Sequence, residues 1–517
     1  MNQGVQSQVD MVKFKIRSNL IIIMLNYEYC QEEDGMSKEK KIKLKNLIAY
    51  GVGDLYGGGS FFIVGTLFMI FLTDVAGLSP FKAGLVFIVG KIWDAISDPL
   101  MGYISDNTET SLGRRRVYFL IGMLPVGISF AMMWYPVDFL NQNFTFLYYV
   151  MAYIFFCTVF TMLMVPYSAL NAEMTFDYKE RTRLNGARMI FSQGSTLIAG
   201  VVPKIVIDNF ATPGKGYFVM GLIFGILYTL PWIFVYLGTW ELETGQQKEK
   251  PSFIDFLKNF KTVFINRSFR IQLGMYLAAY SAMDIIMAVF AYYITYYVNR
   301  PDLFQYCLGA LVIAQLLGLP LYVKLCNRKG GGKTYILGLS IWGVAMFFVS
   351  FLESTTPGIL IILNCIMIGA GLSSGVLVPY AILPMVIDVD EMITAKRRAG
   401  VYAGMMTFIR KTIQALVLFL VGIALETIGY VPNAQQTADT LFKMKILFVF
   451  LPLALIIIGI IVALKLRITP YTHAVLLDEM QRLKQGGDHE KVAASAEEIC
   501  EEMTGLEYSE LYGAGLE

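Results

Sequence analysis

Apolar segments long enough to cross a bilayer recur along almost the whole chain. A helix that spans the ~30 Å hydrocarbon core needs about 20 predominantly apolar residues. Such segments occur at 47–73, 80–105, 117–136, 145–174, 184–207, 217–239, 270–298, 304–325, 334–352, 358–386, 400–428 and 441–466. The pattern predicts an all-α membrane protein with twelve transmembrane helices, because a transmembrane β-barrel would show alternating segments of about ten residues instead.

Lysine and arginine residues are concentrated in every second loop between these segments. The intervening loops contain few of them, such as Lys82, Lys215 and Arg300. The basic stretches lie at 38–45, 113–116, 179–183, 241–270, 327–333 and 395–398. Because basic loops favour the cytoplasmic side of a membrane, we expect a multi-pass protein of the cell membrane with both termini in the cytoplasm.

An internal repeat divides the chain into two halves. The string VPYSALNAEM (165–174) returns as VPYAILPMVI (378–387), and Asp177 matches Asp390 at the same offset. Two related six-helix bundles around a central cavity are typical of transporters with parallel repeats. We therefore expect an N-terminal extension, a first six-helix bundle, a cytoplasmic linker, a second six-helix bundle and a cytoplasmic tail, at 1–45, 46–240, 241–269, 270–467 and 468–517 respectively.

The N-terminal extension contains a second candidate start. Met36 opens the string MSKEKKIKLKN directly before the first apolar segment. The nine residues RSNLIIIML (17–25) are too short to span a membrane and no small-residue cleavage site follows them. We expect residues 1–35 to be a disordered extension or a mis-called start.

Composition excludes several classes of function. The chain is 56% hydrophobic and 16% charged with a net charge of +2, so no nucleic-acid partner is indicated. Its two histidines, His473 and His489, both lie in the tail, so the apolar segments lack the histidine that common hydrolytic sites need. The six cysteines are scattered singly and are expected to be free thiols. We therefore expect neither an enzyme nor a bound cofactor.

The second apolar segment contains aspartates in the string KIWDAISDPLMGYISDN (91–107). A charge at the centre of a bilayer costs roughly 2.5–3.5 kcal/mol even on lenient scales. Asp94 and Asp98 are four residues apart and share a helix face with Ser97. Two such carboxylates repel each other unless a cation or proton lies between them. The alternative is pairing with bases for structure alone, although Lys91 would neutralise one acid at most.

Charged residues near the helix ends suggest a cytoplasmic gate. A solvated helix end beside a basic loop would explain Asp106 and the arginines that follow it without any special role. The second interpretation is a latch, in which Asp106 and the arginines brace helix ends while Arg181 and Arg183 pair with acids of the second half. The candidate gate residues are Asp106, Arg114, Arg115, Arg181, Arg183, Asp388, Glu391 and Arg397.

The motif WDAxxDPxxG within residues 93–102 is similar to that of the glycoside–pentoside–hexuronide:cation symporters of the major facilitator superfamily. The resemblance extends from Tyr50 to Leu466. It includes TDVAGLS, VPY, DVDEMITAKRRAG and GYVPN, at residues 73–79, 165–167, 388–400 and 429–433. It implies the major facilitator fold and a symporter that imports a sugar, glycoside or uronide with Na⁺ or H⁺, acting as a functional monomer.

The resemblance also implies roles for individual residues. The coupling cation would be bound by Asp94, Ser97, Asp98 and Thr161. Substrate-site positions would be Asp54, Gly58, Met164, Ser168, Arg188, Thr407 and Lys411, with Lys411 linking the two sites. Gly58, Met164 and Ser168 replace the two acids and the tryptophan of galactoside-transporting members, so galactoside specificity is not implied.

Three alternatives remain open on the sequence. A major facilitator carrier could take a non-sugar substrate such as a lipid or drug, since a shared fold does not fix the cargo. A membrane sensor or scaffold would bind ligand without transport, although the tail is short for a signalling domain. A membrane-embedded enzyme is the least favoured.

Overall fold

The computed structural model describes residues 42–175, 177–242, 262–486 and 492–512. The proposed start at Met36 and most of the linker therefore lie outside the described residues. Over the described ranges the secondary structure is helical, with no β-strand. This confirms the predicted all-α class.

The first half of the chain, residues 44–238, begins with a span that changes its helical pitch. This span runs through α2 (Leu44–Gly51), α3 (Asp54–Ile63) and two π-helical turns, η1 (Val64–Phe68) and η2 (Phe71–Val75). The remaining helices of this half are α4 (Pro80–Asp106), α5 (Arg116–Met133), α6 (Gln142–Met174), α7 (Tyr178–Asp208), α8 (Pro213–Thr229) and α9 (Pro231–Gly238).

The second half, residues 267–464, repeats this succession of long helices. It contains α11 (Arg267–Tyr292), η3 (Tyr293–Tyr297), η4 (Pro301–Leu303), α12 (Phe304–Lys329), α13 (Gly331–Val349), α14 (Gly358–Thr394), α15 (Ala399–Thr427), α16 (Ala438–Lys445), η5 (Ile446–Phe450) and α17 (Leu451–Leu464). The tail adds α18 (Pro470–Lys484), α19 (Ala494–Thr504) and the short η7 (Tyr508–Glu510).

Eleven helical segments of the described chain are long and apolar enough to cross a membrane. The remaining predicted span is α4, which has 27 residues and is therefore long enough. It does not belong to that group because it contains more charged residues than the other spans have in their apolar stretches. These residues are Lys82, Lys91, Asp94, Asp98 and Asp106. The twelve predicted spans are thus all present as helices, and the most polar of them contains the candidate cation site.

Local sequence signals fix where α4 begins. Ser79 caps the helix, its Oγ accepting a hydrogen bond from the Lys82 backbone N–H at 3.4 Å, and Pro80 occupies the first turn. Proline suits this position because the first N–H groups of a helix have no intrahelical partner. This start places Asp94 and Asp98 in the middle of the helix, at membrane depth.

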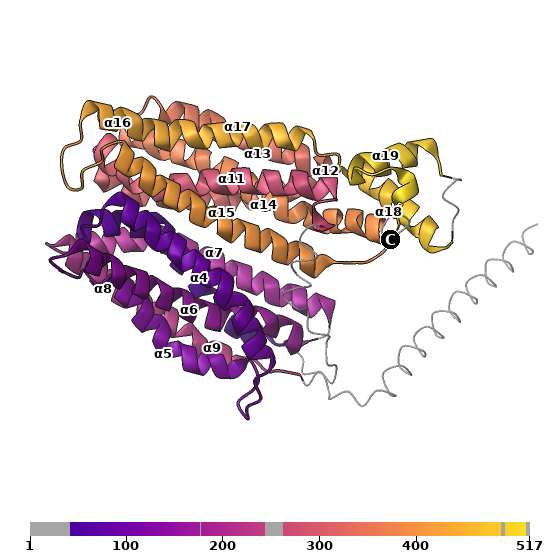
Figure 1. Cartoon of the computed structure of the whole chain (residues 1–517), viewed down its shortest axis with the longest axis horizontal. Coiled ribbons are helices and arrows are strands. Elements are labelled where there is room, and N and C mark those ends of the chain that lie inside the picture. Colours follow the sequence, from indigo (N-terminus) through magenta and orange to yellow (C-terminus); the bar gives the residue numbers. More distant parts are fainter. Residues whose placement is uncertain (1–41, 176, 243–261, 487–491, 513–517) are drawn as a thin grey trace, which may run out of the picture.

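The two halves form two layers, with α4 to α9 in one and α11 to α17 in the other (Figure 1). The layers meet where α4 packs against α15, α7 against α12, and η1 against α11. The approach of α4 to α15 is close because both contain glycine there. A Cβ added at Gly422 would lie 2.5 Å from the Pro80 carbonyl oxygen and 3.0 Å from Gly84 Cα.

A hydrogen-bonded cluster around Asp74 joins the two halves at one end of the molecule. Asp74 Oδ1 accepts hydrogen bonds from the hydroxyls of Thr73 at 2.6 Å and Tyr430 at 2.7 Å, and its other oxygen accepts one from Tyr296. Asn433 donates its side-chain N–H to the Asp74 carbonyl at 2.6 Å. Asp74 belongs to the first half, whereas Tyr296, Tyr430 and Asn433 belong to the second, so these bonds hold the two halves together at this end. We call it the closed end.

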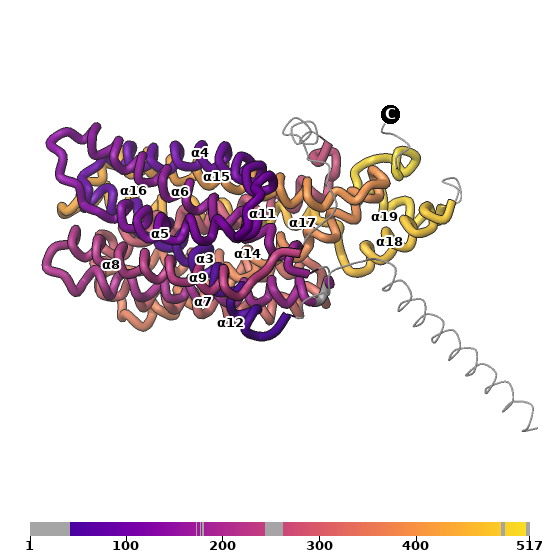
Figure 2. Tube along the Cα trace, turned by 90° about the horizontal axis from the view of Figure 1, so that it is seen from below, coloured from indigo at the N-terminus to yellow at the C-terminus, as the bar shows by residue number. Residues whose placement is uncertain are grey.

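The tail helices lie at the opposite end of the molecule, beyond the membrane helices (Figure 2). They pack against α11 and α14 of the second half. His473 Nε2 lies 2.9 Å from Asp388 Oδ2, and Lys484 Nζ lies 2.6 Å from Glu391 Oε1. The tail is therefore a folded element docked on the second half, and we call this end the tail end.

Candidate cation and substrate site

A cavity of about 680 Å³ lies between the halves, lined mainly by the first half and by Lys411 of α15. Its polar lining residues are Asp54, Asp98, Thr161, Ser168, Arg188, Ser192 and Lys411. Apolar residues such as Phe160, Met164 and Val165 complete the wall. A mostly apolar wall with a few convergent polar groups is typical of small-molecule sites.

The two candidate cation ligands on α4 differ in their surroundings. Asp94 is 2% exposed, and its Oδ2 lies 2.9 Å from Nζ of Lys91, one turn earlier on the same helix. The Lys91 ammonium also lies 4.3 Å from the centre of the Phe61 ring. Lys91 therefore neutralises one acid of the pair, as the sequence allowed.

Asp98 faces the cavity and connects both halves of the molecule. Its Oδ1 accepts a hydrogen bond from Thr161 Oγ1 at 2.7 Å, and its Oδ2 accepts one from Nζ of Lys411. Ser97 Oγ lies 3.5 Å from Thr161 Oγ1. Of the four predicted cation ligands, Ser97, Asp98 and Thr161 are thus linked through Thr161, whereas Asp94 pairs with Lys91, and Lys411 reaches Asp98 from the other half.

The first-half wall of the cavity contains a second ion pair. Arg188 Nε lies 3.2 Å from Asp54 Oδ2, and Arg188 Nη1 donates to Ser168 Oγ at 3.1 Å. The guanidinium also lies 4.9 Å from the centre of the Tyr167 ring. Asp54, Arg188, Ser168, Met164 and Lys411 line the cavity together, as the resemblance implied.

Two predicted substrate positions lie elsewhere. A Cβ at Gly58 would meet Ser192 Oγ at 2.4 Å, so Gly58 serves the close packing of α3 on α7, and Gly57 lines the cavity instead. Thr407 donates its hydroxyl to the Ala403 carbonyl at 2.9 Å and is not among the described residues that line the cavity. Helix phase explains the difference at Gly58, because a shift of one residue turns a side chain by about 100°. Thr407 lies four residues before Lys411 and therefore on the same face of α15, one turn away from that lining residue.

Arg410, beside Lys411 on α15, forms a buried ion pair with Asp284 that was not predicted from the sequence. Its guanidinium binds both Asp284 oxygens, at 2.7 and 2.8 Å, and lies 4.7 Å from the centre of the Tyr280 ring. Gln414 donates a further hydrogen bond to Asp284 at 3.2 Å. The available signal was the spacing of Arg410 and Gln414, which are four residues apart on one helix face.

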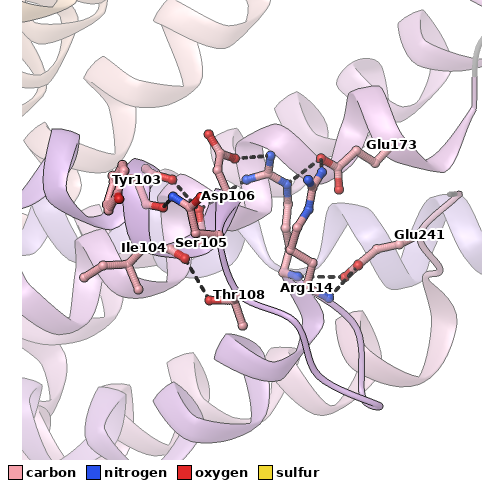
Figure 3. Close-up of polar contacts among 11 residues, drawn as sticks. Tyr103, Ile104, Ser105, Asp106, Thr108, Arg114, Glu173 and Glu241 are labelled. Carbon is pink, nitrogen blue, oxygen red and sulfur yellow. Dashed lines mark hydrogen bonds and ion pairs between the residues drawn. The ribbon is translucent and has the colours of Figure 1, made fainter. Parts of the chain in front are cut away.

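The charged residues at the tail end of the first half form one network (Figure 3). Arg115 joins Asp106 of α4 to Glu173 of α6, at 2.7 Å to each, and Arg114 also contacts Glu173. Glu241 accepts the backbone N–H groups that open α5, at 2.7 to 2.9 Å. These contacts brace the ends of neighbouring helices within the first half.

No ion pair joins Arg181 or Arg183 to the acids of the second half among the residues that the structure describes. Among the described residues, Arg183 pairs with Glu180, and Arg181 donates to the Thr175 carbonyl at 2.8 Å. Asp388 and Glu391 pair with Arg397 at 3.1 and 3.0 Å and with the tail. The physical reason is that the halves meet at the closed end, so each set of charges finds partners in its own half.

Comparison with known proteins identifies the family. A family model described as MFS/sugar transport protein matches residues 49–470, which is most of the chain. The chain belongs to this family. Its membership agrees with the twelve helices in two halves and confirms the resemblance to cation symporters of the major facilitator superfamily.

Members of the family that resemble this chain include bacterial proteins named as symporters or importers. The chain is 31% identical to the uncharacterized symporter YnaJ of Bacillus subtilis, over 82% of this chain and 91% of that protein. It is 28% identical to the putative sulfoquinovose importer of Salmonella typhimurium, over 87% of this chain and 95% of that protein.

Solved structures support the fold alone. A single-residue mutant of the nucleoside transporter NupG superimposes with a TM-score of 0.57 at 14% identity, over 82% of this chain and 98% of the other. Fold likeness at this identity does not transfer a substrate. The chain is therefore a multi-pass membrane protein with the major facilitator fold.

Proposed function

We propose that this protein is a symporter that uses the inward flow of Na⁺ or H⁺ to import a sugar, glycoside or uronide. The observation that carries the proposal is the contact between Lys411 and Asp98. This contact joins a residue of the substrate cavity to a residue of the cation pocket, and the two residues come from different halves. Relatives named as symporters and as an importer support the same reading.

The ion pair provides a route for coupling. A cation at Asp94 and Asp98 would compete with Lys411 for the Asp98 carboxylate, because both are attracted to the same oxygens. Lys411 would then be available to the substrate, so cation binding would raise substrate affinity. By linkage, substrate would raise cation affinity by the same factor.

The conformation described here would be inward-facing under this proposal. The basic loops at 113–116 and 395–398 lie at the tail end, where Arg115 and Arg397 make the contacts described above. By the positive-inside rule, that end would face the cytoplasm. The closed end around Asp74 would then seal the outer side of the cavity.

The proposal is tested by uptake into proteoliposomes with and without a Na⁺ or H⁺ gradient, using a panel of sugars, glycosides and uronides. Asp94→Asn and Asp98→Asn should each abolish cation-stimulated uptake, because an amide has no negative charge to balance Na⁺ and no carboxylate to accept a proton. Asp439→Asn is the matched control, since Asp439 is exposed and pairs with Lys443 at the closed end.

Two results would contradict the proposal. Cation-driven accumulation of wild-type size in both aspartate variants would remove the cation site from α4. Gradient-driven uptake of a lipid or drug, with none of any carbohydrate on the panel, would favour the non-sugar carrier instead.

A further inference from the structure

The charged groups in and beside the cavity cancel one another. The acids Asp54, Asp94, Asp98 and Asp284 are matched by the bases Arg188, Lys91, Lys411 and Arg410, and each acid is ion-paired with its base. Every pair is partly or fully buried, the exposed fraction of each side chain being 31% or less. The cavity without a bound ion is therefore neutral.

A coupling cation changes this balance. Either Na⁺ or a proton adds one positive charge at Asp94 and Asp98, and the Asp98 carboxylate can no longer be fully shared with the Lys411 ammonium. A buried charge without a partner is costly, because the low dielectric does not replace its hydration. A neutral sugar would leave this extra charge in place, whereas a substrate with one negative charge would cancel it.

We infer that the substrate of this carrier is a sugar or glycoside with an anionic group, a carboxylate or a sulfonate; this inference rests on the proposed cation-coupled function. Lys411 and Arg188 line the same cavity from opposite halves, with 31% and 24% of their side chains exposed. Arginine suits such a role because charge-assisted hydrogen bonds from a guanidinium to an anionic group are shorter and stronger than those to a neutral group.

The two cationic side chains also explain why an anionic group would favour closure. Arg188 comes from α7 in the first half and Lys411 comes from α15 in the second half. A carboxylate or sulfonate bound between them would attract both, and would draw the halves together around the substrate. A neutral hydroxyl in the same place would accept weaker hydrogen bonds.

The test compares pairs of substrates that share the same sugar ring and differ in one group, which is anionic in one member and neutral in the other. Methyl glucuronide carries a carboxylate where methyl glucoside carries a hydroxymethyl group. In the second pair, the glucoside is compared with an analogue in which a sulfonate replaces the hydroxyl of that group. Uptake into proteoliposomes under a cation gradient should favour the anionic member of at least one pair by about tenfold or more. Galacturonide and xyloside analogues extend the panel to other ring stereochemistries.

Met164 allows the charge of the cavity to be changed without removing any ion pair. It lines the cavity, and its Cε would lie 2.8 Å from a Cβ added at Gly57, beside Asp54. Met164→Glu adds one negative charge and should reduce the preference for the anionic sugar by about tenfold. Met164→Gln has the same size and polarity without the charge, and should keep the wild-type preference.

The outcomes separate this inference from the function on which it rests. Cation-driven uptake that favours the neutral member of every pair would overturn the anionic substrate and leave the symporter standing. Equal effects of Met164→Glu and Met164→Gln would also overturn it, since charge would not be the cause. If no member of the panel accumulates under either gradient, the proposed function fails and the inference fails with it.

Discussion

Asp74 is a single carboxylate on which the contact between two halves of the molecule depends. Its oxygens accept the hydroxyls of Thr73, Tyr296 and Tyr430, and the Thr73 hydroxyl lies 2.8 Å from that of Tyr292. Hydrogen bonds to a charged group contribute about 1.5–3 kcal/mol each, roughly twice a neutral one. The bonds from Tyr296 and Tyr430 form only when the halves are in contact at the closed end, so they stabilise that conformation over one in which this end is separated.

Replacing Asp74 should therefore open the closed end. In the wild type, the hydroxyls of Thr73, Tyr296 and Tyr430 donate to two carboxylate oxygens, and Asp74→Asn leaves them only one acceptor oxygen. Tyr430→Phe removes one of the three donors. Either variant should increase the population with a separated closed end by about tenfold, measured as the distance between spin labels at residues 215 and 302. The double variant should add little to the single ones, because both disrupt the same bonds.

Tyr297→Phe is the matched control for this experiment. The Tyr297 ring stacks on Tyr293, with centres 4.8 Å apart, rather than bonding to Asp74. A shift of equal size in Tyr297→Phe, or fully additive effects of the two test variants, would show that the Asp74 cluster does not hold this end closed.

The sequence could identify single charges at membrane depth, but not their partners. Asp94 and Asp98 were evident because charge inside an apolar helix is rare and functional by default. The partner of Asp98 is 313 residues away, so only a family resemblance pointed to it. Asp74 lay within a recognised motif, yet its tyrosine partners lie in the other half. Gly58 was misplaced because helix phase is not fixed by sequence alone.

At the scale of helices, α4 combines a polar middle with a close-packed start. Its first turns approach α15 at Gly84 and Gly422, while Phe81 N donates to Glu426 Oε2 at 2.7 Å. The length and position of this helix followed from its apolar pattern, which placed a span at 80–105. Its packing against α15 did not, because contacts between distant helices depend on which faces meet.

A side chain at Gly422 should prevent this approach. Gly422→Ala would place its Cβ against backbone atoms of Pro80 and Gly84, which cannot rotate away, so α4 and α15 would have to separate. Uptake should fall by at least about tenfold, since forced overpacking typically costs 1–3 kcal/mol. Gly102→Ala on α4 is the control, because no heavy atom lies within 4 Å of its added Cβ. Full uptake by Gly422→Ala would contradict this account.

At the scale of the whole molecule, the two halves differ because the tail helices pack against the second half. These helices engage Asp388 and Glu391, the acids that the sequence assigned to a gate between halves. Ser268 Oγ donates to the Met503 carbonyl at 2.6 Å, and Tyr512 N donates to the Met392 carbonyl at 2.7 Å. The sequence indicated a soluble tail, helical or partly disordered, and its acidic composition gave no sign of where it docks.

Docking of the tail can be followed through its buried thiol. Burial raises the pKa of Cys500 to about 12, so little reactive thiolate is present at pH 8. Leu476 is 0% exposed, and Leu476→Ala should weaken the packing of the tail helices by about 2–5 kcal/mol. Maleimide labelling of Cys500, located by peptide mapping, should then accelerate at least about tenfold.

Leu477→Ala provides the comparison, because Leu477 is 36% exposed on the same helix. Its labelling rate should stay near that of the wild type. Unchanged labelling in Leu476→Ala would mean that Leu476 does not hold the tail in place.

The four balanced ion pairs of the cavity also bear on the response to membrane voltage. Moving one elementary charge across 100 mV changes the free energy by about 2.3 kcal/mol. The empty carrier would reorient without moving net cavity charge, and so would a carrier holding one cation and one anionic sugar. A half-loaded carrier, with cation alone or with anionic sugar alone, would be voltage-sensitive. The form with cation alone also buries an unbalanced charge, so the same arrangement would suppress an uncoupled cation leak.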